Sequence, residues 1–147
     1  MITVMWLLRR KAGVTFEQFR DHYETSHAVL GAKYLGHLLL GYRRNYVLPA
    51  TAGEGGSDLT RRVFQSKAWD YDCIAEWDLA DEEAFAQALA IVADPEIGKI
   101  FYEDEEHFLD RASVRLVRID QRQTDTSACV PPDALPRSPG TANLWEV

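Results

Sequence analysis

Residues 2–31 read ITVMWLLRRKAGVTFEQFRDHYETSHAVLG and contain the strand–turn–helix unit that decides the fold. Residues 2–9 are apolar on both alternating faces, which predicts a strand that needs cover on each side. Thr15 and Gln18 have the spacing of a capping box, in which two side chains satisfy free backbone N–H groups at a helix start. The helix should end near Gly31, because glycine is a common stop residue. Its apolar face carries Phe16, Phe19, Tyr23, His27 and Leu30 at helical spacing.

The rest of the chain continues this alternation of strands and helices. The patterns predict strands at 37–48, 71–79 and 114–119, a helix from the Asp81 cap to Val92, and a short helical piece at 96–102. The order strand, helix, strand, strand, helix, strand is that of the ferredoxin-like βαββαβ arrangement, an α+β fold with an antiparallel sheet. The domain spans 1–120 with a long loop insertion at 49–69, and residues 121–147 form an extended C-terminal tail.

One face of the predicted sheet lacks a cover within a single chain. The helices of a ferredoxin-like fold lie on one side only, yet both faces of the first strand are apolar. A second copy of the same sheet, related by a two-fold axis, is the economical cover. We therefore expect a homodimer whose sheets face each other and form a dimeric α/β barrel.

The composition is that of an ordinary globular domain with an acidic balance. The net charge is -7, which argues against a nucleic-acid partner, and no polybasic segment suits an anionic membrane. The apolar start precedes the basic residues, the reverse of a secretory signal, and it is too short to span a bilayer. Cys73 and Cys129 lack metal-ligand spacing and suggest a reducing compartment. The sequence thus predicts a cytoplasmic protein without nucleic-acid or membrane partners.

Four segments with recognisable motifs follow one another along the chain. They are Phe19-x3-Tyr23-x3-His27, a second strand with Tyr42, the segment 71–77 (YDCIAEW), and the acidic segment 104–110 (DEEHFLD) before the last strand. In this order the four segments resemble the EthD-like family of the dimeric α/β-barrel superfamily. The resemblance covers about residues 2–120 and implies a pocket between the sheet and the helices of each subunit. Relatives with this fold include cofactor-free muconolactone isomerases, polyketide cyclases and dehydratases, and quinol monooxygenases, while many members have no known reaction.

His27 is the first candidate for catalysis. Histidine side chains ordinarily titrate near pH 6.5, so they can take up or release a proton at working pH. The family resemblance also implies that a histidine of the first helix faces the pocket. The alternative is a histidine that caps the helix or is satisfied in the core. Asp72 and Glu76 share one strand face, so either acid could orient a histidine or act as a base. The alternative for both is a solvent-facing or salt-bridged strand acid.

The acidic segment contains His107, a secondary candidate acid or base. We interpret the segment itself as a solvated face that also caps neighbouring elements, since its acids lack a recognised metal-ligand spacing. Cys73 is interpreted as a small buried apolar residue rather than a nucleophile. Aromatic side chains with polar tips suit a pocket for a flat ligand, although ordinary core packing is the alternative for most of them. The candidates for substrate binding are Tyr23, Tyr42, Trp77, Trp6 and Tyr102.

The motifs of cofactor-dependent chemistry are missing from the sequence. We find no Gly-rich phosphate loop, no nucleophile elbow and no zinc pattern. Chemistry should therefore be proton transfer in an apolar pocket without cofactor or metal. The leading hypothesis is a cofactor-independent lyase or isomerase, of dehydratase, cyclase or lactone-isomerase type, acting on a small hydrophobic or aromatic oxygenated metabolite. The alternatives are a non-catalytic accessory dimer that binds a hydrophobic ligand, and a cofactor-free quinol-type monooxygenase.

Overall fold

The computed structural model describes residues 1–48 and 70–134. The chain divides into two compact units, one formed by 1–48 with 71–120 and the other by 49–70 with 121–147. Of the second unit, residues 121–133 are exposed, and the described chain after 120 contains one 3-10 helical turn, η4 (Pro132–Ala134). The predicted loop insertion at 49–69 and the end of the predicted tail lie outside the described residues. The site belongs to the first unit.

A four-stranded sheet with the order β2-β3-β1-β4 forms the base of the first unit. Its strands are β1 (Ile2–Leu8), β2 (Leu39–Tyr46), β3 (Cys73–Leu79) and β4 (Arg115–Ile119). Every neighbouring pair is antiparallel, and the two central strands pair along their whole length. The predicted ferredoxin-like α+β fold is thus confirmed, with strands a little shorter than the apolar patterns suggested.

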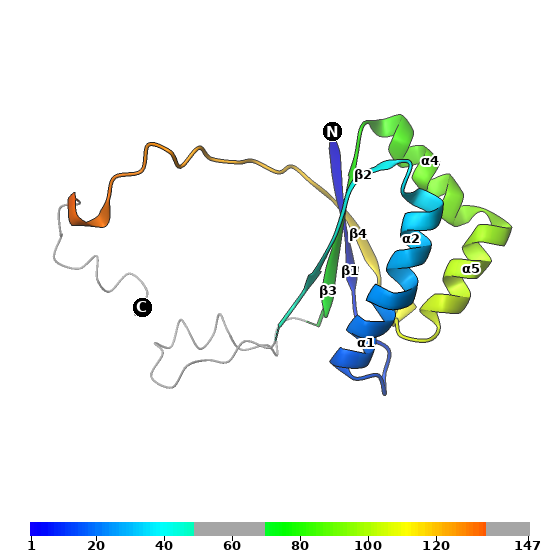
Figure 1. Ribbon diagram of the computed structural model, residues 1–147. Helices are drawn as coiled ribbons and strands as arrows, with labels where there is room; N and C mark the ends of the chain where they lie inside the picture. The colour runs from blue at the N-terminus through cyan, green and yellow to red at the C-terminus, as the bar shows by residue number, and fades with distance from the viewer. Residues whose placement is uncertain (49–69, 135–147) are drawn as a thin grey trace. The chain divides into compact units, whose positions relative to one another are not determined.

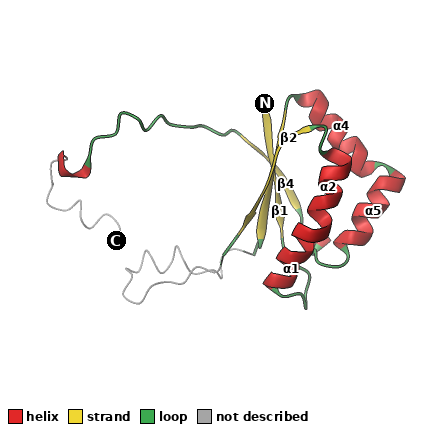
Figure 2. Ribbon diagram, in the orientation of Figure 1, coloured by secondary structure: helices red, strands yellow, loops and turns green. Residues whose placement is uncertain are grey.

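The main helices lie on the same side of this sheet (Figure 1, Figure 2). They are α1 (Phe16–His22), the π-helical segment η1 (Tyr23–His27), α2 (Ala28–Leu35), α4 (Glu82–Ala93) and α5 (Pro95–Glu105), and a 3-10 turn, η3 (Arg111–Ser113), leads into β4. Alternate side chains of the strands face these helices and form the core with them, among them Val4, Trp77 and Leu79. Among the residues that the structure describes in the first unit, no helix lies on the opposite face of the sheet, the helix-free face (Figure 1).

The first helix begins where the sequence predicts and ends later. Thr15 Oγ1 accepts a hydrogen bond from Gln18 N (3.1 Å), and Gln18 Oε1 accepts one from Thr15 N (3.0 Å), so the capping box is confirmed. The predicted stop at Gly31 is wrong, because the helical chain continues through η1 and α2 to Leu35. A Cβ atom at Gly31 would lie 3.1 Å from Cε1 of Tyr42. This glycine therefore permits close helix–sheet contact instead of ending the helix.

The helix α5 is longer than the predicted piece at 96–102. Its N-cap Asp94 accepts hydrogen bonds from the backbone N–H groups of Glu96 and Ile97, and the helix continues to Glu105. Part of the acidic segment is therefore helical and not a wholly solvated face. Asp104 in particular is turned inward, with a side chain that is only 10% exposed.

The helix-free face of the sheet is only partly apolar. Met5 of β1 lies opposite Val117 of β4 on this face, since their neighbours Val4 and Trp6 face the helices. Toward β2 the same face is polar, where the Arg43 guanidinium binds both Glu76 (3.0 Å) and Asp78 (2.6 Å). The apolar character that the sequence predicts for both faces of the first strand therefore does not extend to the β2–β3 half of this face.

Candidate active site

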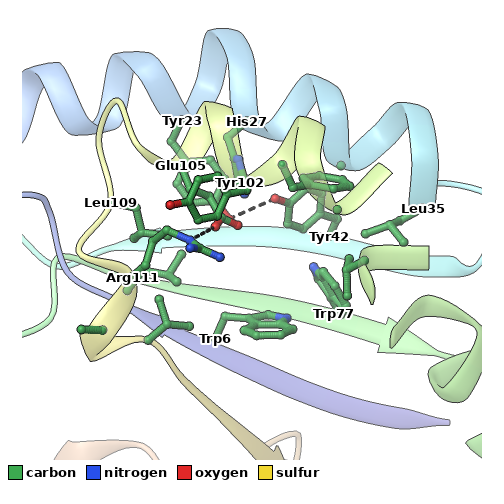
Figure 3. Close-up of a pocket in the computed structure, with 17 residues that line it drawn as sticks. Trp6, Tyr23, His27, Leu35, Tyr42, Trp77, Tyr102, Glu105, Leu109 and Arg111 are labelled. Carbon is green, nitrogen blue, oxygen red and sulfur yellow. Dashed lines mark hydrogen bonds and ion pairs between the residues drawn. The ribbon is translucent and has the colours of Figure 1, made fainter. Parts of the chain in front are cut away.

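A cavity of about 530 Å³ lies between the sheet and the helices of the first unit (Figure 3). Trp6 and Trp77 line it from the sheet, with ring centroids 5.2 Å apart in an edge-on arrangement. Tyr23 and His27 line it from η1. Helix α5 contributes Phe101, Tyr102 and Glu105, and the turn η3 contributes Arg111. The walls are therefore mainly apolar, with several aromatic side chains and a few polar groups, as is usual for small-molecule sites.

The imidazole of His27 is held by a carboxylate. Its Nδ1 lies 2.9 Å from Oδ2 of Asp104, and the two side chains are 14% and 10% exposed. A carboxylate can only accept, so Nδ1 carries the hydrogen and donates it. In the neutral ring this leaves Nε2 as a free acceptor, that is, as a base. The π-helical turn that carries His27 is a feature often found at functional sites.

Asp104 binds two further side chains of the first helical segment. The hydroxyl of Ser26 donates to Oδ1 at 2.5 Å, and Nε2 of His22 donates to the same oxygen at 3.0 Å. Burial disfavours the charged carboxylate, but the hydrogen bonds from His27, Ser26 and His22 outweigh it and lower the pKa of Asp104 to about 2. Asp104 is therefore ionised at working pH and fixes the orientation of His27.

Two tyrosine hydroxyls meet at the wall of the pocket. The Oη atoms of Tyr23 and Tyr42 are 3.0 Å apart, so one hydroxyl donates to the other. Burial raises the pKa of Tyr42 to about 12, and burial together with the neighbouring Tyr42 raises the pKa of Tyr23. Both phenols consequently stay protonated. The pair uses one of its two hydrogens internally and has the second available for an oxygen atom of a ligand.

An arginine and a glutamate stand together at the pocket. Nε of Arg111 donates to Oε2 of Glu105 at 2.7 Å, and the Arg111 guanidinium carbon lies 4.0 Å from the ring centroid of Tyr102. The Arg111 side chain is 42% exposed, so this group is in contact with solvent as well as with the cavity.

A comparison with protein families identifies the chain. The model of the EthD domain matches residues 11–112. The protein belongs to the EthD family. The resemblance inferred from the sequence motifs is thereby confirmed. No curated protein matches the chain.

Solved structures share the fold of this EthD protein at low sequence identity. The Arabidopsis thaliana protein At3g17210 superposes with a TM-score of 0.54 at 17% identity, covering 85% of this chain and 99% of its own. An ethyl tert-butyl ether D family protein from Bacillus halodurans superposes with a TM-score of 0.51 at 19% sequence identity, covering 83% of this chain and 100% of its own. HapK from Hahella chejuensis superposes with a TM-score of 0.50 at 11% sequence identity, covering 87% of this chain and 99% of its own. These likenesses concern the fold alone.

The pocket of the EthD protein includes most of the predicted site residues. His27, Tyr23, Tyr42, Trp77, Trp6 and Tyr102 all line it. Asp72 does not, because β3 begins one residue later, and its carboxylate accepts a hydrogen bond from the backbone of Arg10 (2.9 Å). Glu76 binds Arg43 on the helix-free face. His107 is exposed and stacks on His22 with ring centroids 5.5 Å apart, outside the pocket lining.

Cys73 fits the interpretation as a buried apolar residue. It is fully buried and does not line the pocket, and burial raises the pKa of its thiol to about 12. A thiol with so high a pKa is protonated at working pH and is a poor nucleophile.

Sequence reasoning missed three polar groups at the site, Asp104, Glu105 and Arg111. A helical pattern was available to find the first, because Ile97, Phe101, Asp104 and Phe108 recur at spacings of four, three and four. An acid on such an apolar face points inward and needs a partner. For Arg111 no comparable signal exists, since it lies in a short turn.

Two further properties hold for the described residues. None of the helices there has the length and apolar character needed to cross a membrane. In the same part of the chain, no three His, Cys, Asp or Glu side chains are grouped so that they could hold a metal ion.

Proposed function

We propose that this EthD protein is a cofactor-independent lyase or isomerase that transfers a proton on a small hydrophobic or aromatic oxygenated metabolite. The observation that carries the proposal is the hydrogen bond between His27 and Asp104 at the wall of an apolar cavity. It supports an imidazole of fixed tautomer whose Nε2 serves as the base. The cavity also falls within the roughly 300–1,000 Å³ of ordinary small-molecule sites.

In the proposed reaction, His27 Nε2 removes a proton from a carbon next to a carbonyl group of the bound compound. The electron pair of the broken C–H bond forms a new C=C bond, and the π pair of the carbonyl group moves onto its oxygen, which gives an enolate. An isomerase returns the proton from Nε2 to a different carbon. A lyase gives it to a leaving hydroxyl, which departs as water while the enolate collapses. Both routes regenerate neutral His27 and need no oxidant or reductant.

The tyrosine pair has a defined part in this proposal. The hydrogen that Tyr23 and Tyr42 do not use between themselves is donated to the developing enolate oxygen. A donor fixed in advance in an apolar site stabilises such a charge more than water does. The imidazolium that forms at His27 is stabilised in turn by the Asp104 carboxylate, which is ionised throughout.

We further propose that the protein acts as a homodimer in the cytoplasm. The apolar half of the helix-free face, with Met5 opposite Val117, supports a second copy as its cover. The free thiols of Cys73 and Cys129 are consistent with a reducing compartment.

The test measures proton transfer directly, without knowledge of the natural substrate. Enolisable ring ketones such as 2-tetralone, and the unsaturated α-angelica lactone, are incubated with the protein in D₂O, and exchange or isomerisation is followed by proton NMR. Replacing His27 with Gln should lower the enzymatic rate by about 100-fold or more, because a positioned base contributes about 100- to 10,000-fold. His37→Gln is the matched control, since His37 is exposed and outside the pocket lining.

The outcomes separate the proposal from its alternatives. A His27→Gln protein that keeps the wild-type rate contradicts the role of His27. If the wild type and the His27→Gln variant both bind these ring compounds tightly but catalyse no proton exchange, the accessory ligand-binding function is favoured. Oxygen uptake on a hydroquinone without cofactor favours the quinol-type monooxygenase.

A further inference from the structure

Arg111 is placed at the pocket by a turn that the rest of the fold holds firmly. The residue lies in η3, just after α5 and just before β4. The backbone N–H of Asp110 donates to the carbonyl of Arg9 (2.9 Å), and that of Lys11 donates to the carbonyl of Phe108 (2.8 Å). These bonds tie the turn to the end of β1, so the arginine projects from a fixed backbone position.

The guanidinium is oriented by two neighbours and still has free donors. Glu105 accepts the hydrogen of Nε, and the ring of Tyr102 packs against the guanidinium at 4.0 Å. Among the described residues, Nη1 and Nη2 of Arg111 have no hydrogen-bond partner. Figure 3 shows the side chain extending from the Leu109 side of the pocket toward the space between Tyr42 and Trp6.

The charge of Arg111 stands out against the remaining lining. The other acidic or basic residues that line the pocket are Glu105 and His27. The Glu105 carboxylate already accepts the hydrogen bond from Nε of Arg111. Trp6, Trp77 and Phe101 are among the aromatic residues that line the same pocket. A fork of two N–H groups on a pre-oriented guanidinium matches the two oxygens of a carboxylate, a geometry that lysine cannot offer.

We propose that the ligand of this pocket is a flat ring that carries a carboxylate, with the carboxylate bound end-on by Nη1 and Nη2 of Arg111 and the ring packed against Trp6 and Trp77. This inference rests on the proposed function in that it names the substrate class of the same site. Glu105 is assigned a positioning role, since it turns the guanidinium without contacting the ligand carboxylate.

The experiment compares two probes of equal shape and different charge. 1-Hydroxy-2-naphthoate carries the carboxylate, and 1-hydroxy-2-naphthamide replaces it with a neutral amide. Binding to the full chain is measured by calorimetry at low and moderate salt. The wild-type protein should bind the carboxylate about 10-fold or more tightly than the amide, and Arg111→Gln should remove that preference while it leaves amide binding within about twofold.

Two further variants sharpen the result. Arg111→Lys keeps the charge but loses the fork, and should recover only part of the preference. Arg118→Gln is the matched control, because Arg118 also pairs with a glutamate, Glu82 at 2.7 Å, but lies outside the pocket lining. It should bind both probes like the wild type.

Several results overturn the inference. These are equal affinity of the wild type for both probes, no binding of either probe, or an equal loss of both affinities in a folded Arg111→Gln protein. If Arg111→Gln does not fold, as judged by circular dichroism, the Arg111→Lys variant provides the test. A preference for the carboxylate probe in that variant as large as in the wild type contradicts two-point binding by Nη1 and Nη2. Because binding is measured without turnover, failure here leaves proton transfer on neutral substrates intact, and failure of the His27 test leaves carboxylate binding intact.

Discussion

Asp104 connects two parts of the chain that are far apart in sequence. It accepts hydrogen bonds from His22, Ser26 and His27, about 80 residues earlier. A carboxylate with three donors remains ionised although it is largely buried, which its low pKa reflects. The same residue therefore joins α5 to the first helical segment and sets the tautomer of the proposed base.

Replacing Asp104 with Asn should cost both stability and activity. At pH 7 we expect a loss of about 1–2 kcal/mol in the free energy of unfolding, because the folded pKa of about 2 lies below the roughly 3.9 of an unfolded aspartate. The sign follows from that direction: the stabilisation is present above the unfolded pKa and is lost as pH falls toward the folded pKa. The difference in the free energy of unfolding between the wild type and the variant should thus shrink from pH 5 to pH 2.

Urea denaturation at pH 7, 4.5 and 3 measures this gap. Asp21→Asn is the control, because the Asp21 side chain is 69% exposed and, among the described residues, pairs only with its neighbour Arg20. A gap that stays constant across this range means that the Asp104 charge is not what stabilises the contact. The rate of proton exchange in the variant should fall at least about tenfold at pH 7, since the imidazole loses its ionised partner.

At the scale of elements, the strands were more predictable than the site. Short apolar runs indicate strands, and a capping residue followed by helical spacing indicates a helix, so the positions of β1, β3 and α4 follow from short windows of sequence. The helical spacing of Asp104 with Ile97, Phe101 and Phe108 indicates that it turns inward. The spacing does not indicate which side chains bind it, because its donors come from another helical segment. The helix α5 extends to Glu105, beyond the predicted end at residue 102. The sequence did not predict this extension, because the consecutive acids at 103–105 are typical of a solvent-exposed segment when their binding partners are not known.

Gly31 shows how one residue couples α2 to the sheet. Ala normally stabilises a helix by roughly 0.5–1 kcal/mol relative to Gly. Here the added methyl would meet Cε1 of Tyr42 at 3.1 Å, and Tyr42 is held by its hydrogen bond to Tyr23. We therefore predict that Gly31→Ala fails to stabilise the protein and instead costs about 1 kcal/mol, while it disturbs the tyrosine pair.

Thermal and urea unfolding of Gly31→Ala test this prediction. Val29→Ala in the same helix is the control, because Val29 is 57% exposed and should gain slightly from the higher helix propensity of alanine. The double variant Gly31→Ala with Tyr42→Leu should recover stability relative to Tyr42→Leu alone if the clash is the cause. A stabilised Gly31→Ala protein would show that Tyr42 moves aside without cost.

At the scale of the whole molecule, the helix-free face is the surface that we propose for the contact between subunits. Its β1–β4 half carries Met5 and Val117, and Val117 is 37% exposed in the single chain. Its β2–β3 half is satisfied internally, since Arg43 neutralises Glu76 and Asp78, and Asp78 also accepts a hydrogen bond from Thr3 at 2.8 Å. We therefore expect the β1–β4 half to form the centre of the contact in the proposed homodimer.

A charge placed in that centre should separate the subunits. Val117→Glu would bury an unpaired carboxylate against its copy, which costs several kcal/mol and should convert a dimer to a monomer at micromolar concentration. Sedimentation equilibrium measures the mass of each protein. Val29→Glu, an equally charged change on the exposed side of α2, should leave the mass unchanged. If the wild type sediments as a monomer, the helix-free face is not a dimer contact and the pocket of one chain must act alone.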